Sequence, residues 1–179
     1  MGKRSNFDRV PRDYYPTPLE AVRPLVPHLP KGHFSFREPC AGDGRLIKHV
    51  ESLTSGKCTY ASDIEPRAEG IIQRDALQFG YRHKPPIVDV VCITNPPWDR
   101  KILHPLIEIW AEHMPTWLLF DADWMHTKQS GPYMKYCKRV VSVGRVKWIE
   151  GSKQTGKDNC CWYLFDKSLS TGGTLFYGR

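Results

Sequence analysis

The tetrapeptide Asn95-Pro96-Pro97-Trp98 holds the residues of this sequence whose types and spacing most clearly favour chemistry. The lone pair of an exocyclic amine is delocalised into its ring, so such a nitrogen attacks poorly unless acceptors hold its hydrogens. The Asn95 side-chain oxygen and the Pro96 carbonyl are two such acceptors. Pro97 biases Pro96 to an extended conformation, which fixes the direction of the Pro96 carbonyl. Trp98 offers a flat face for a stacked base. The tetrapeptide therefore predicts a site that positions an exocyclic amine without a base or a metal. The alternative is a proline turn that ends a strand with a packing tryptophan.

The segment from Glu38 to Gly44 has the composition of a ligand-binding turn. Its glycines allow a sharp turn and a close approach of the backbone to a ligand, and the helix predicted after it directs amide groups at that ligand. The third glycine of the dinucleotide fingerprint is missing, and Glu38 and Asp43 would repel a pyrophosphate. These carboxylates suit a cationic ligand that carries an ammonium and a sulfonium group. Any tight turn is the alternative explanation.

Two aspartates follow at the ends of predicted strands. Asp63 lies about 20 residues after the glycines, where an acidic residue accepts hydrogen bonds from ribose hydroxyls. Asp75 ends the next strand, where a carboxylate can accept from an adenine amino group. Each aspartate can instead cap the segment that follows it.

The chain alternates between strand and helix patterns. Strands are predicted at 33–38, 58–62, 70–74, 87–93, 117–120, 140–149 and 160–165, and helices at 45–53, 102–113 and 131–138. A further helix is predicted from a Thr17 cap, with Pro18 in its first position, to about Pro27. This alternation predicts an α/β fold with a mainly parallel sheet covered by helices on both faces. Ligands bind beyond the carboxyl ends of strands in such sheets, and the candidate residues all lie at such ends.

Composition bounds the remaining possibilities. The 179 residues suit a single domain, 1–179, with residues 1–12 as a flexible arm. The net charge of +7 favours phosphate-rich partners, although a soluble surface can also be basic. Six cysteines without a C-x-x-C pair, and histidines without metal-binding spacing, predict no metal site and a reducing compartment. No segment has the pattern of a membrane span or a secretory signal, so a cytoplasmic location is expected.

The sequence resembles the S-adenosylmethionine (SAM)-dependent amino-methyltransferases, the group that includes the DNA adenine-N6 methyltransferases. The resemblance covers roughly residues 14–165 and rests on four motifs in family order: the segment 15–18, the glycine motif 38–44, the aspartates Asp63 and Asp75, and the tetrapeptide 95–98. It implies a Rossmann-like class I methyltransferase fold, with a mostly parallel seven-stranded sheet and a C-terminal antiparallel hairpin. The glycine motif begins Glu-Pro-Cys where many members have Asp-Pro-Phe. The chain is similar to the small phage or prophage enzymes of this group, which lack a target-recognition domain.

The resemblance implies SAM as cofactor, S-adenosylhomocysteine as product and the tetrapeptide as the catalytic element. Candidate substrate contacts are Trp98 and the basic residues Arg100, Lys101, Lys153 and Lys157, for which a helix start with exposed charges and a solvated loop are the alternatives. The implied cofactor residues come from five segments. They are Tyr15, Pro16 and Thr17; Glu38, Pro39, Cys40, Ala41, Gly42 and Gly44; Asp63 and Ile64; Asp75 and Ala76; and Asn95.

The expected activity is methyl transfer to the N6 amine of adenine in DNA, on a flipped base or a single strand. Two alternatives stay open: methylation of RNA adenine or of a protein glutamine, and a SAM-binding partner subunit without catalysis. RNA is a possible nucleic-acid partner, and a dimer is possible.

Overall fold

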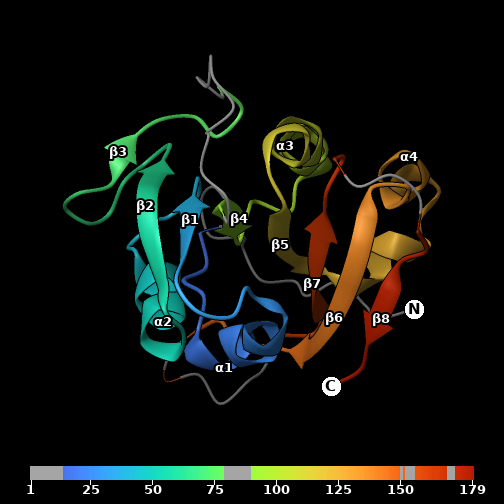
Figure 1. Ribbon diagram of the computed structural model, residues 1–179, viewed down its shortest axis with the longest axis horizontal. Coiled ribbons are helices and arrows are strands. Elements are labelled where there is room, and N and C mark those ends of the chain that lie inside the picture. Colours follow the sequence, from blue (N-terminus) through green and yellow to red (C-terminus); the bar gives the residue numbers. More distant parts are fainter. Residues whose placement is uncertain (1–13, 79–89, 150, 152–155, 169–171) are drawn as a thin grey trace.

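The computed structural model describes residues 14–78, 90–149, 151, 156–168 and 172–179 (Figure 1). Residues 1–12, predicted as an arm, and Lys153 lie outside the described residues. The described strands form one sheet in the order β3-β2-β1-β4-β5-β7-β6-β8. They are β1 (Phe34–Glu38), β2 (Gly56–Asp63), β3 (Ile72–Gln73), β4 (Val90–Thr94), β5 (Thr116–Asp121), β6 (Cys137–Arg145), β7 (Asn159–Phe165) and β8 (Leu175–Tyr177).

The predicted α/β architecture is confirmed. Strands β3, β2, β1, β4 and β5 are parallel, and β7 runs antiparallel to both β5 and β6, which makes β6–β7 the expected C-terminal hairpin. The sheet has an eighth strand beyond the seven predicted, since β8 pairs in parallel with the outer edge of β6. Its three residues are too few to show an alternating pattern in the sequence.

Helices cover both faces of the sheet, as predicted (Figure 1). Successive residues of β5 point to opposite faces of the sheet. Trp117 and Leu119 pack with a first set of helices, which lie before β2 in the chain, and Leu118 and Phe120 pack with a second set, which follows β4. Because both faces are covered, β5 is apolar along nearly its whole length. The first set is α1 (Leu19–Val22), the 3-10 helix η2 (Arg23–His28) and α2 (Arg45–Leu53); the second includes α3 (Arg100–His113), the 3-10 helices η3 (Ala122–His126) and η4 (Lys128–Ser130), and α4 (Gly131–Met134).

Several predicted boundaries are wrong. The first helix is capped by Pro18 rather than Thr17, and it tightens into η2, which holds Pro24 and Pro27. Prolines have no amide hydrogen for an α-helical bond. The predicted helix 131–138 ends early because β6 begins at Cys137, and β6 then ends at Arg145, before the predicted limit. The predicted third strand keeps only the two residues of β3.

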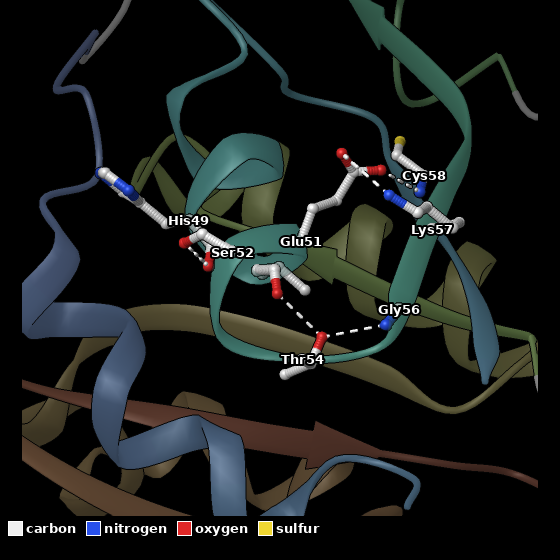
Figure 2. Close-up of polar contacts among 8 residues, drawn as sticks. His49, Glu51, Ser52, Thr54, Gly56, Lys57 and Cys58 are labelled. Atoms are coloured by element: carbon white, nitrogen blue, oxygen red, sulfur yellow. Dashed lines mark hydrogen bonds and ion pairs between the residues drawn. The ribbon is translucent and has the colours of Figure 1, made fainter. Parts of the chain in front are cut away.

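The connection from α2 to β2 is fixed by local hydrogen bonds (Figure 2). The Thr54 hydroxyl donates to the Val50 carbonyl at 2.8 Å and accepts from the Gly56 amide at 3.1 Å. A Cβ on Gly56 would overlap the ring of Phe34, so β2 starts in close contact with β1. The pairing of β2 with β1 shifts by one residue between Phe36 and Arg37, and β2 then ends with Asp63 at the carboxyl edge of the sheet.

Candidate active site at the carboxyl edge of the sheet

A buried hydrogen bond joins the two predicted motifs. Thr94, the last residue of β4, donates from Oγ1 to Glu38 Oε1 at 2.6 Å, and Glu38 is the last residue of β1. The two strands are adjacent and parallel. The glycine turn that follows Glu38 and the tetrapeptide that follows Thr94 therefore leave the sheet side by side, at its carboxyl edge.

The glycine turn is also tied to the end of β2. The Ala41 amide donates to the Ser62 carbonyl at 2.9 Å, and the Gly42 amide donates to Asp63 Oδ2 at 2.8 Å. Asp63 Oδ1 accepts from the Glu65 amide at 2.8 Å. The Asp63 carboxylate thus holds the glycine turn to the end of β2. The glycine motif and the residue predicted to bind the ribose are therefore in direct contact.

Tyr14 covers the turn, a contact that the sequence reasoning did not assign. Gly42 has a φ of 52°, and a Cβ there would lie 2.7 Å from Tyr14 Cε2. The Arg67 guanidinium lies 3.9 Å from the centre of the Tyr14 ring. The backbone amide of Arg67 donates to the Gly42 carbonyl at 2.9 Å. Burial, and then the Asp43 carboxylate, raise the Tyr14 pKa. In the sequence, Tyr14 lies just before the motif 15–18, and this position is the feature that could have indicated its place at the site.

Glu38 is a completely buried acid with one unsatisfied oxygen. Its Oε1 accepts from Thr94 and from the Cys40 amide at 3.2 Å, whereas its Oε2 has no hydrogen-bond partner among the described residues. Burial raises the Glu38 pKa well above its ordinary value; the hydrogen bonds from Thr94 and Cys40 oppose this, and the Asp63 charge adds to it. A cation placed against Oε2 would relieve this cost.

The second predicted aspartate lies at the same edge. Asp75 Oδ1 accepts from the Leu77 amide at 2.9 Å, so Asp75 does cap a turn. Burial raises the pKa of the Cys40 thiol, the Glu38 charge adds to this, and Asp63 and Asp75 both contribute. Ile64 and Ala76, the predicted cofactor residues next to these aspartates, have different surroundings. The Ile64 side chain is 50% exposed to solvent, whereas the Ala76 carbonyl accepts a hydrogen bond from Trp110 Nε1 at 3.0 Å.

The Asn95 amide is oriented by the N-terminal segment. Its Nδ2 donates to the Tyr15 carbonyl at 3.2 Å and to Thr17 Oγ1 at 3.1 Å. Both contacts use the nitrogen end of the amide, so its oxygen end remains the acceptor that the sequence argument requires. Pro16 is half-buried between the two partners, Pro96 is buried and Pro97 is half-buried.

Trp98 is half-buried and belongs to an aromatic group that the sequence reasoning missed. Its ring packs edge-on against Trp148, with centroids 6.0 Å apart, and Trp148 lies 6.3 Å from Tyr15. The Gly156 amide donates to the Val146 carbonyl at 2.8 Å, and a Cβ on Gly156 would lie 3.2 Å from the Trp148 ring. The described base of the β6–β7 loop therefore holds Trp148 against Trp98. In the sequence, the position of Trp148 just before a loop that contains Gly151 and Gly156 is the feature that could have indicated this contact.

The predicted basic contacts are only partly gathered at this edge. Arg100 and Lys101 are exposed in the first turn of α3, where Asp99 caps the helix by accepting from the Lys101 amide at 2.9 Å. Arg100 donates to the Gln129 side chain. Lys157 is exposed in the β6–β7 loop.

In the part of the chain that the structure describes, no group of three His, Cys, Asp or Glu side chains could hold a metal ion. None of the described helices has the length and apolar character needed to cross a bilayer.

Comparison with known proteins identifies solved structures that have a similar fold. No protein-family model and no curated protein matches the chain. A protein assigned to the class I SAM-dependent methyltransferases of Listeria monocytogenes superposes with a TM-score of 0.58 at 10% identity, over 97% of this chain and 68% of that chain. A protein assigned as the modification subunit of a type I restriction enzyme from Vibrio vulnificus YJ016 gives 0.55 at 15% identity, over 92% and 47%. A dimethyladenosine transferase from Plasmodium falciparum gives 0.52 at 20% identity, over 87% and 63%.

The chain therefore has the Rossmann-like class I methyltransferase fold. It spans less than half of the Vibrio subunit.

Proposed function

We propose that this chain transfers a methyl group from SAM to the exocyclic N6 amine of adenine in DNA. The observation that carries the proposal is the Asn95 amide, whose nitrogen is held by Tyr15 and Thr17 while it sits one residue from the Thr94–Glu38 hydrogen bond. An oriented acceptor thus lies beside a turn suited to a cationic ligand.

The charges of this turn suit the cofactor. The unpartnered, buried Glu38 Oε2 suits the ammonium end of SAM. Asp63 would hold the ribose hydroxyls, while Asp75 and the exposed Ile64 would contact the adenine ring. When bound, SAM supplies an electrophilic methyl group on a sulfonium.

The catalytic role of the chain is positioning. Asn95 Oδ1 and the Pro96 carbonyl accept the two amine hydrogens and direct the nitrogen lone pair at the methyl carbon. With SAM bound, a new N–C bond would form as the S–C bond of the cofactor breaks, S-adenosylhomocysteine would leave, and the methylated amine would lose one proton to solvent. Trp98, backed by Trp148, provides the face on which the adenine stacks.

Glu38→Gln is expected to stabilise the cofactor-free protein and to weaken SAM binding. A glutamine oxygen can still accept from Thr94 and Cys40, but the variant buries no charge. The raised pKa means that the folded state holds the Glu38 proton more tightly than the unfolded state, so wild-type stability falls as pH rises above the unfolded pKa. The gain at pH 8 should be about 1–3 kcal/mol and should shrink toward zero near pH 4.5.

Urea unfolding of both proteins at pH 5 and pH 8, together with SAM calorimetry, measures these effects. A glutamine variant that is less stable than wild type at pH 8, or that binds SAM equally well, would contradict the assignment of Glu38.

Three observations support adenine in a nucleic acid as the acceptor. The net charge of +7 favours a polyanion. The structural neighbours include a dimethyladenosine transferase and a restriction-enzyme modification subunit. The pair of tryptophans suits a planar base better than an aliphatic amide.

Incubation of the purified chain with tritiated SAM and separate DNA, RNA and protein pools tests the proposal. We expect label in DNA, recovered as N6-methyladenine after digestion. Label confined to RNA would change the polymer but keep the chemistry. Label confined to protein, or SAM binding without transfer to any polymer, would refute the proposal.

A further inference from the structure

The β6–β7 loop presents an apolar side chain to solvent immediately after Trp148. Ile149 is 61% exposed, whereas Trp148 is half-buried against the Trp98 side of the site. An isoleucine that is this exposed adds little to the core. Other apolar side chains are similarly exposed, among them Ile64 and Leu175, and Ile149 differs from them by its basic surroundings and its place beside Trp148.

The loop around Ile149 is basic. Residues 145–158 contain four basic and two acidic side chains. Arg145, Lys147 and Lys157 are exposed, and none of them takes part in an ion pair within the described ranges. Exposed cations of this kind contact phosphate oxygens and fix the register of a protein on a duplex.

The loop is also held at the active site. The contact between Trp148 and Trp98 places it beside the tetrapeptide, and the hydrogen bond from Gly156 to the Val146 carbonyl closes its base. Ile149 is therefore the next residue beyond an aromatic side chain that already borders the proposed base pocket.

We propose that Ile149 is a wedge that enters the base stack of duplex DNA and fills the space left by the flipped adenine, while Arg145, Lys147 and Lys157 hold the neighbouring phosphates. This inference rests on the proposed function, because a base inside a duplex must leave the stack to be methylated. Apolar side chains inserted between base steps compensate for the unstacking. The wedge would let the loop beside the proposed active site open the duplex.

The test compares Ile149→Ser with wild type on three forms of one oligonucleotide. Its sequence is that of the adenine site found by modified-base sequencing of DNA from cells that express the chain. The forms are the paired duplex, the same duplex with an abasic position opposite the target adenine, and the single strand. Leu175→Ser, at a residue 55% exposed on β8, is the matched control, and Ile149→Leu tests whether an apolar side chain suffices.

We expect Ile149→Ser to slow single-turnover methylation of the paired duplex by about tenfold, because the unstacked state loses its filler. The other two substrates should react at nearly the wild-type rate, and Ile149→Leu and Leu175→Ser should behave as wild type. An equal loss on all three substrates, or no loss on the paired duplex, would overturn the wedge. Wild-type activity on the single strand alone would overturn the wedge and leave the proposed function intact. Wild-type inactivity on all three forms would refute the proposed function itself.

Discussion

Asn95→Ala is expected to reduce the methylation rate by about 100- to 1,000-fold, the loss that follows removal of a preorganised polar group at a reacting centre. The affinity for SAM should stay within about threefold of wild type. The expected selectivity has a structural reason, because the amide nitrogen is bound to Tyr15 and Thr17, which leaves its oxygen as the proposed acceptor of an amine hydrogen. Single-turnover kinetics and SAM calorimetry separate the two effects.

Thr17→Val is the matched control for this prediction. It keeps the shape of the buried side chain and removes one of the two acceptors that orient Asn95 Nδ2. The rate should fall by about tenfold, as expected for one hydrogen bond, and by more than SAM affinity does. An equal loss of SAM affinity would instead support the cofactor contact that the resemblance implies for Thr17. Equal losses of rate and SAM affinity in Asn95→Ala would mean that the amide belongs to the cofactor site and not to the amine.

Asp63→Ala is expected to weaken SAM binding by about 10- to 100-fold, since hydrogen bonds to charged groups contribute about 1.5–3 kcal/mol. The variant loses the proposed ribose acceptor and also the acceptor of the Gly42 amide, so the turn loosens at the same time. Calorimetry of SAM and of S-adenosylhomocysteine measures the change, and both ligands should lose similar affinity because they share the ribose.

Glu65→Ala supplies the control for charge alone. Glu65 is an exposed acid at the same strand end, paired with Arg67 at 3.3 Å, and it has no proposed contact with the ribose. Its removal should change SAM affinity by less than about twofold, as is usual for exposed ion pairs. Similar losses in Asp63→Ala and Glu65→Ala would assign the effect to net charge and remove Asp63 as the ribose ligand.

The sequence predicts the fold well where a residue pattern is local. The helix 45–53 matches α2 because its apolar spacing is regular, and the parallel strands β4 and β5 are recognisable as continuous apolar runs. The short strand β8 was not predictable, since its three residues gain their structure only by pairing with β6. The end of β6 was placed too late because Trp148 and Ile149 have a strand-like composition, although they belong to a loop.

The candidate site shows the same division. Strand-end positions identified Glu38, Asp63 and Asn95, because parallel strands bring their carboxyl ends to one edge. The contacts of Tyr14 with Gly42 and of Trp148 with Trp98 join segments distant in the sequence, so the local signals can mark Tyr14 and Trp148 as candidates but cannot reveal their partners. The predicted cap at Thr17 was wrong for a related reason: its hydroxyl accepts from Asn95, which lies 78 positions later in the chain.

The hydrogen bonds from Asn95 to Tyr15 and Thr17 make the proposed chemistry depend on the start of the described chain. Cleavage that removes residues 14–17 would take away both partners of the Asn95 amide while the sheet and its two apolar clusters stay folded. Such a preparation would show normal circular dichroism and thermal melting and yet turn over slowly. The integrity of this segment therefore has to be checked before an inactive preparation is read as a non-catalytic protein.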